Sequence, residues 1–296
     1  MPHLYGGSRF AAFIEQRSRA IIEDELNRHA DWSPARSLKQ MAGKIPHEYE
    51  GGFFIELIQN GHDAHPHGSI DGTLHITLDR TEGEYGCVYV ANRGRPFSES
   101  NVKALCDIAA SDKPPGQDVG NKGVGFRSVR QVTDWPEIYS AGDSVGSDQF
   151  DGFCFGFARP ADVLRLTNGD KSARNRILEH IDPYFLPVPI AERGSTVKEF
   201  AVQGFATVIR LPLRSALAKK EALRRFTELE DSQSPILLFL ERISSLTLEL
   251  KDGNNSRRKV LHRSTRTITG LSGQSGYRFE EVGLADQGVS FWSALL

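Results

Sequence analysis

The stretch from Glu56 to Ala64 contains a carboxylate, a carboxamide and a second carboxylate at helical spacing. On a helix, Glu56, Asn60 and Asp63 stand at positions i, i+4 and i+7, so all three project from one face. Such a cluster is costly to bury, and it makes sense if a cation and phosphate groups lie against it. A plain amphipathic helix with its polar face in water explains this segment equally well.

Two further segments combine glycines with polar residues. Asn92 and Gly94 follow an apolar, strand-like run, where a glycine allows a ligand ring to approach the backbone closely. Three glycines within 120–125 precede a predicted helix, so backbone N–H groups and the helix N-terminus could surround anionic oxygens. Taken singly, both are weak signals because glycine-rich turns are common. The second segment also lacks the strand before a dinucleotide fingerprint and the Gly-Lys-Ser/Thr ending of a P-loop.

The order and spacing of these segments together are much more specific than any one of them. The chain resembles the GHKL ATPases, the family of gyrase, the heat-shock-ninety chaperones, histidine kinases and MutL. The matching segments are Glu56…Asn60…Asp63-Ala64 (the N-box), Asn92-Arg93-Gly94 (the first glycine box), Gly120–Gly125 (the second glycine box) and Gly204–Ile209, which contains the final threonine, Thr207. The sequence around the boxes is most similar to that of the sacsin-like branch, and the resemblance covers roughly residues 45–212.

The resemblance implies a role for each matching residue. Glu56 would act as general base toward the attacking water, and Asn60 would hold Mg²⁺ through its carboxamide oxygen. Asn92 would accept a hydrogen bond from the adenine amino group, and Gly94 would make room for the ring. The other residues expected to contact the nucleotide are Asp63, Ala64, Lys113, Gly120, Lys122, Gly123, Val124, Gly125, Phe126 and Thr207. Among them, the glycines would wrap the phosphates, a lysine would add charge, and the threonine would contact adenine.

The implied activity is slow, Mg²⁺-dependent ATP hydrolysis. It would close a lid at 109–125 and change the surface offered to a protein partner or a second copy. One alternative is a nucleotide-gated interaction module that binds ATP without hydrolysing it. Another is the ATP domain of a histidine kinase, although His29 lacks the acidic neighbour and partner helix of a phospho-accepting histidine.

The sequence departs from the wider family at the first glycine box. Asn92 stands where the family usually has Asp, so an acceptor oxygen remains but the negative charge does not. Pro96 replaces the next glycine of that box, as in sacsin-like members. Glu56 and Asn60, which hydrolysis needs, are both present.

The elements that must position these residues form a mixture of helices and strands in irregular order, which favours an α+β fold. Periodicity predicts helices over 8–29, 48–64, 98–108, 126–132, 217–230 and 235–240, and strands over 73–78, 87–91, 137–141, 150–157, 206–211, 244–250, 259–263 and 277–282. The stretch 161–200 has no clear pattern.

The resemblance further implies a Bergerat-type α/β sandwich, with a mixed, mainly antiparallel sheet covered by helices on one face. We expect an N-terminal helical segment at 1–44, the ATP-binding domain at 45–213, and a helix-plus-strand extension at 214–296 that could begin a further domain.

Composition sets broad limits on function. The net charge of −2 gives no overall attraction to nucleic acid or to a membrane surface, and we expect no membrane partner. A basic cluster at 257–266 leaves nucleic acid open, but a solvated hairpin explains it better. The three cysteines lack metal-ligand spacing, and no secretory signal is visible, so we expect a cytoplasmic protein. His62, His65 and His67 are expected to lie at a solvated helix end rather than to bind a metal.

Overall fold

The computed structural model describes residues 8–28, 35–36, 39, 52–106, 125–142, 149–231, 236–267, 280–286 and 289–295. The helices are α1 (Arg9–Leu26), α4 (Phe53–Asp63), α5 (Glu99–Cys106), α6 (Pro160–Leu166), α7 (Lys171–His180), α8 (Ser195–Val202) and α9 (Ala216–Glu230), with 3-10 turns η1 (Gly125–Gln131), η2 (Pro183–Phe185) and η3 (Ile236–Phe239). The strands are β1 (Gly72–Asp79), β2 (Cys87–Asn92), β3 (Glu137–Ser140), β4 (Cys154–Phe157), β5 (Pro187–Pro189), β6 (Thr207–Pro212), β7 (Ile243–Asp252), β8 (Asn255–Thr267), β9 (Glu280–Asp286) and β10 (Val289–Leu295).

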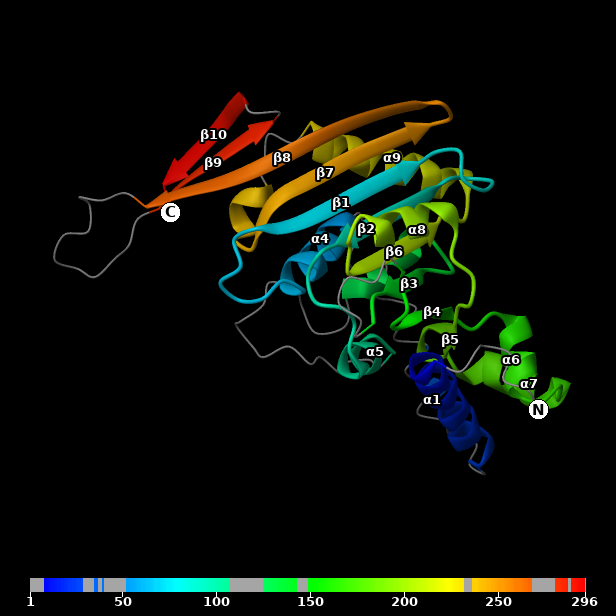
Figure 1. Cartoon of the computed structure of the whole chain (residues 1–296). Coiled ribbons are helices and arrows are strands. Elements are labelled where there is room, and N and C mark those ends of the chain that lie inside the picture. The colour runs from blue at the N-terminus through cyan, green and yellow to red at the C-terminus, as the bar shows by residue number, and fades with distance from the viewer. Residues whose placement is uncertain are drawn as a thin grey trace.

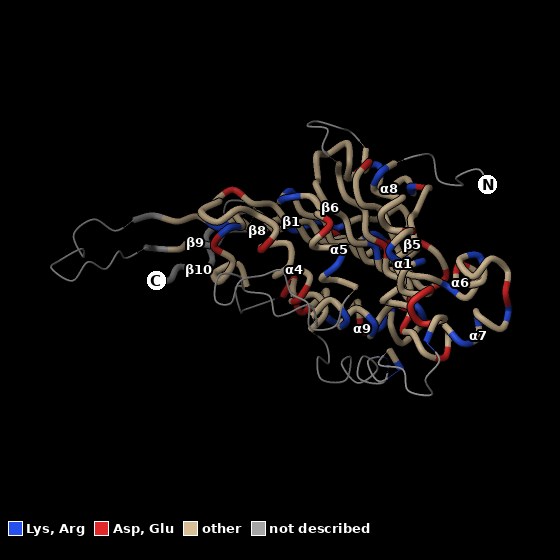
Figure 2. The backbone as a smooth tube through the Cα atoms, turned by 90° about the horizontal axis from the view of Figure 1, so that it is seen from below, with Lys and Arg blue, Asp and Glu red and all other residues tan. Residues whose placement is uncertain are grey.

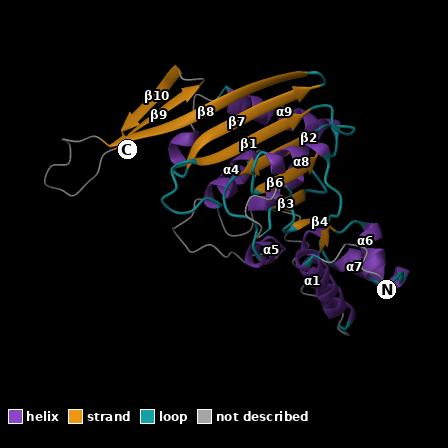
Figure 3. Ribbon diagram, viewed as in Figure 1, coloured by secondary structure: helices purple, strands orange, loops and turns teal. Residues whose placement is uncertain are grey.

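One mixed sheet organises the described chain. Its ten strands lie in the order β10-β9-β8-β7-β1-β2-β6-β3-β4-β5. All neighbouring strands are antiparallel except β1 and β7, which are parallel. The predicted α+β fold with a mainly antiparallel sheet and a strand-rich C-terminal part is therefore confirmed (Figure 3).

The two faces of the central strands bury different clusters because side chains alternate along each strand. Val88 and Val90 of β2 join the core cluster that contains α4 and α9 side chains, including Phe54 and Phe226. The rings of Phe54 and Phe226 are 6.4 Å apart, so these two helices meet on this face. We call it the α4 face.

The opposite face, which we call the α8 face, is also covered by a helix. Tyr89 of β2 packs there with Val197 and Phe200 of α8. Figure 1 shows α8 in front of the sheet and α4 behind it. The prediction had placed the helices on one face, and α8 adds cover on the other. It lies in the stretch 161–200, where the sequence showed no pattern.

A third cluster joins the N-terminal helix to the far end of the sheet. Ile22 of α1 packs with Val163 of α6, Ile177 of α7 and Val188 of β5. The hydroxyl of Ser18 donates to the carbonyl of Pro187 at 2.6 Å, which fixes α1 against the edge strand β5. The predicted helix over 8–29 is thus an integral part of the packing.

One predicted strand is shorter than expected. The strand predicted over 150–157 begins only at Cys154. Just before it, Gly152 lies so close to Ala141 that a side chain at Gly152 would overlap the Ala141 backbone. Basic and acidic residues are interspersed along α7 and α8 (Figure 2). Within the described ranges, none of the helices combines the length and apolar character needed to cross a bilayer.

Candidate functional site

Helix α4 brings its polar face against the end of the glycine-rich segment. Phe53, Phe54 and Leu57 are buried, which turns Glu56 to the border of the core in the first helical turn. A β-carbon added at Gly125 would overlap Glu56 Oε2, so the carboxylate lies directly against the backbone at the start of η1. The structure therefore unites the first and third sequence motifs at one place.

The strand ends supply a second group of polar residues on the α4 face. Asn92 pairs with Thr207 across β2 and β6, and Thr207 pairs with Ser140 across β6 and β3. All three are buried. Asn92 Oδ1 accepts a hydrogen bond from Gly94 N at 3.0 Å, and Ser140 Oγ accepts one from Phe97 N at 2.8 Å.

Unlike its neighbours Asn92 and Ser140, Thr207 has a side chain that is unpaired among the described residues. Its hydroxyl oxygen is fully buried and has no hydrogen-bond partner within the described chain. An unpaired buried hydroxyl costs about 1–3 kcal/mol unless something else satisfies it. A ligand beside Asn92 would supply the missing partner.

The loop after β2 is fastened to the end of α4. Arg95 N donates to the carbonyl of Ala64 at 2.7 Å, and the Arg95 guanidinium reaches the carbonyls of Ala64 and Asp63 at 3.3 and 3.2 Å. A β-carbon at Gly94 would lie 2.6 Å from the Ala64 carbonyl. The absent side chain of Gly94 thus permits this loop–helix contact, while its predicted role beside a ligand ring stays a prediction.

Asp63 is buried at the same end of α4. Its Oδ1 lies 3.0 Å from Nδ1 of the neighbouring His62, and both side chains are almost completely buried. The carboxylate is therefore held inside the protein beside the His62 ring.

The histidine run is only partly solvated. His67 is exposed, as predicted, but His62 and His65 are buried, so the prediction was wrong for these two. The carbonyl of Gly61 accepts from His65 Nδ1 at 2.7 Å, and His65 Nε2 accepts from Thr73 N at 3.3 Å. These contacts require a neutral ring, and burial lowers the pKa of His65. Among the described residues, no cluster of three or more His, Cys, Asp or Glu side chains is arranged to hold a metal ion.

Only the start of the turn η1 lies against the candidate site, because its next two side chains are buried. Phe126 is buried, and its ring centroid lies 6.4 Å from that of Phe157, so its side chain belongs to the core. Arg127 is also buried; its guanidinium packs over the Phe185 ring at 4.7 Å and finds no hydrogen-bond acceptor within the described chain. Burial lowers the pKa of Arg127. Sequence reasoning missed this arginine, although its place between Phe126 and Val129 signals burial.

Several predicted site residues belong to the glycine-rich segment and the expected lid. Lys113, Gly120, Lys122, Gly123 and Val124, together with most of the expected lid at 109–125, lie outside the described residues. The structure thus brings together Glu56 with Gly125, and Asn92 with Thr207. Asn60 stands between these pairs along α4.

Comparison with known proteins gives the family. A model described as "Sacsin domain" matches residues 36–263, which is more than half of the chain. This chain belongs to the sacsin domain family.

Two curated relatives of this sacsin domain are large proteins. The chain is 28% identical over 196 residues to "Protein NO VEIN" from Arabidopsis thaliana, covering 66% of this chain and 6% of that protein. It is 27% identical over 249 residues to "Sacsin" from Homo sapiens, covering 75% of this chain and 5% of that protein. The match therefore spans only a small part of either relative.

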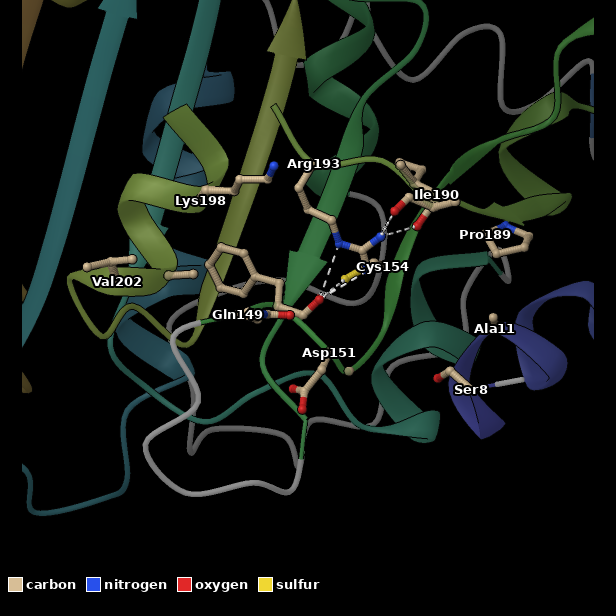
Figure 4. A pocket seen from close by; sticks show the side chains of 14 residues that line it. Ser8, Ala11, Gln149, Asp151, Cys154, Pro189, Ile190, Arg193, Lys198 and Val202 are labelled. Atoms are coloured by element: carbon tan, nitrogen blue, oxygen red, sulfur yellow. Dashed lines mark hydrogen bonds between the residues drawn. The ribbon is translucent and has the colours of Figure 1, made fainter. Parts of the chain in front are cut away.

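This sacsin domain has a separate pocket of about 710 Å³ on the α8 face (Figure 4). Arg193 crosses it and donates to the carbonyls of Phe150, Ile190 and Ala191. The guanidinium therefore braces two loops against each other. None of the residues predicted from the sequence to bind a nucleotide lines this pocket.

Proposed function

We propose that this sacsin domain binds Mg²⁺-ATP on the α4 face and hydrolyses it slowly. The observation that carries the proposal is the contact between the Glu56 carboxylate and the backbone of Gly125, because it joins an acid–base group to the glycine-rich segment. The support at the other end is the buried, unpaired Thr207 hydroxyl beside Asn92. The ordered spacing of the GHKL motifs adds to both.

The residues at this place are suitable for binding both Mg²⁺ and the base of ATP. A carboxamide oxygen is a suitable ligand for Mg²⁺, so Asn60 would hold the ion, which would neutralise phosphate charge when bound. Asn92 and Thr207 offer hydrogen-bonding groups to a base. Gly61 lies close to Asn92, with its missing β-carbon 3.7 Å from Asn92 Cβ. Gly61 lies five helical steps beyond Glu56, which separates the two ends of the site by about 7.5 Å along the helix.

The chemistry assigned to the protein is positioning and proton transfer. Glu56 would orient a water molecule and take its proton as the water attacks the terminal phosphorus, while the bond from that phosphorus to the bridging oxygen breaks and ADP leaves. The start of η1 would place backbone N–H groups near the phosphate oxygens. Coupling of hydrolysis to a protein partner or a second copy is the further proposal that the resemblance suggests.

The test is phosphate release from Mg²⁺-ATP by the parent chain, Glu56→Ala and Glu199→Ala. Glu199 is an exposed glutamate on α8, so it controls for loss of a carboxylate elsewhere. We expect the Glu56 variant to lose release by about 100-fold or more while the control keeps it. Binding of a fluorescent ATP analogue is measured beside each rate.

The outcomes separate the alternatives. Binding without release by the parent would overturn hydrolysis and support a nucleotide-gated interaction module. Absence of binding would overturn the nucleotide site itself. Equal release by the parent and Glu56→Ala would remove Glu56 from its assigned role.

A further inference from the structure

The orientation of the Asn92 side chain is fixed by a backbone donor. Gly94 N–H can only donate, and it lies 3.0 Å from Asn92 Oδ1. With the amide reversed, Nδ2 would face that donor without an acceptor between them. The oxygen must therefore point to Gly94, and the NH₂ group must point away from it.

The Asn92 NH₂ group is available for a ligand. Within the described chain, the structure assigns it no hydrogen-bond acceptor. Asn92 lies on the α4 face between Leu74 of β1 and Thr207 of β6. Its neighbour, the Thr207 hydroxyl, can donate or accept and is equally without a partner there.

We propose that Asn92 makes this site accept 6-oxopurine triphosphates alongside ATP. This inference rests on the proposed nucleotide site. A 6-amino group donates and a 6-oxo group accepts. Asn92 Nδ2 can donate to the oxo group, and the second lone pair of Oδ1 can accept from the amino group. A carboxylate at this position would offer acceptors only, and it would repel the oxo group.

Inosine triphosphate is the probe that isolates this contact. Hypoxanthine and adenine differ at position 6 and in the proton on N1, and both lack a 2-amino group. The Thr207 hydroxyl can serve either state of N1, because it both donates and accepts. Selectivity between the two nucleotides therefore falls on Asn92.

The experiment measures displacement of a fluorescent ATP analogue by ATP and by inosine triphosphate. For the parent we expect dissociation constants within about threefold of each other. Asn92→Asp, which has nearly the same shape, should disfavour inosine triphosphate relative to ATP by about tenfold or more. Thr207→Val serves as the control, because it should weaken both nucleotides and leave their ratio unchanged.

Two results overturn the inference. One is a parent that prefers ATP by more than about tenfold, and the other is an Asn92→Asp variant whose ratio of the two dissociation constants equals that of the parent, since either would show that Asn92 does not read position 6. The parent ratio needs no variant, so the inference is tested even if Asn92→Asp fails to fold. If neither nucleotide binds, the proposed function fails and this inference fails with it, whereas tight ATP selectivity overturns this inference alone.

Discussion

The two faces of the central strands differ in whether their buried polar groups have hydrogen-bond partners. On the α8 face, Arg210 bonds Glu137 at 2.7 Å and Glu82 at 2.8 Å. The hydroxyls of Tyr89 and Tyr139 donate to the same two carboxylates at 2.6 and 2.7 Å. Every charge in this cluster has an opposite charge or a hydroxyl beside it.

A second paired cluster lies on the α8 face near β7. Glu249 accepts from Thr77 Oγ1 at 3.3 Å and from Ser256 Oγ at 3.1 Å, and it lies 3.2 Å from His75 Nε2. On the α4 face, by contrast, the buried hydroxyl of Thr207 is unpaired within the described chain. The guanidinium of Arg127, in the neighbouring turn η1, is unpaired there too.

We infer from this contrast that the paired groups stabilise the fold, whereas the unpaired Thr207 hydroxyl belongs to the proposed nucleotide site. A satisfied buried network stabilises one arrangement, whereas an unsatisfied buried group costs free energy and is retained where function needs it. Substitutions on the α8 face should therefore change stability, and those on the α4 face should change nucleotide binding.

The largest effect is expected from Arg210→Met. It leaves Glu82 and Glu137 half-buried without their shared cation, which should lower the free energy of unfolding by about 2–4 kcal/mol. Urea unfolding measures this, with Arg224→Met as control, because the Arg224 pairs on α9 are exposed. The control should change stability by about 0.5 kcal/mol or less. Similar losses from both variants would contradict the stabilising role of the α8 face.

The next largest effect is expected from Gly94→Ala, which should lower the free energy of unfolding by about 1–3 kcal/mol. The new β-carbon would lie 2.6 Å from the Ala64 carbonyl, so the loop must separate from α4. Gly194→Ala is the matched control, since a β-carbon there meets no atom within 4 Å. Thermal unfolding compares the two, and an unchanged midpoint for Gly94→Ala would show that the loop adapts without cost.

The Glu249 cluster should give stability that depends on pH. The hydrogen bond with His75 lowers the pKa of Glu249 to about 2, from an ordinary 4.5. Because the folded pKa is the lower one, the stabilisation is present above about pH 4.5 and is lost as the pH falls toward 2. Allowing for solvent screening of this half-buried group, we expect about 1–2 kcal/mol.

Glu249→Gln tests that expectation. Its free energy of unfolding should fall below that of the parent at neutral pH, and the gap should close between about pH 4.5 and pH 2. Urea unfolding of both proteins across this range gives the measurement. A gap that stays constant would assign the stabilisation to something other than the carboxylate charge.

The smallest effect on stability is expected from Thr207→Val, and its comparison with Thr77→Val tests the difference between the faces most directly. Thr207→Val removes an unpaired hydroxyl, so unfolding should be unchanged or slightly harder, while ATP binding weakens by about tenfold. Thr77→Val, equally buried on the α8 face, should lose about 1 kcal/mol of stability and keep its affinity for ATP. Calorimetry and nucleotide titration measure both variants, and a reversed pattern would refute the distinction.

Local patterns predicted the elements that contain the site. Helical spacing identified α4 and its polar face, alternation identified β1, β2 and β6, and the order of the glycine boxes indicated the sacsin-like family. These features depend on residues near one another in sequence, so they can be read before the chain is folded. The helix α8 escaped prediction because its N-cap is Gly194 and no side-chain cap marks where it begins.

Only the tertiary structure decided which of these residues meet. The parallel pairing of β1 with β7 joins residues more than 160 positions apart, and the antiparallel pairing of β2 with β6 places Asn92 beside Thr207. The same packing buried His62 and His65, set Gly94 against Ala64 and left the Thr207 hydroxyl unpaired within the described chain. Sequence alone determined the residue types and local elements; burial and hydrogen-bond partners depend on long-range contacts, which exist only once the strands have paired.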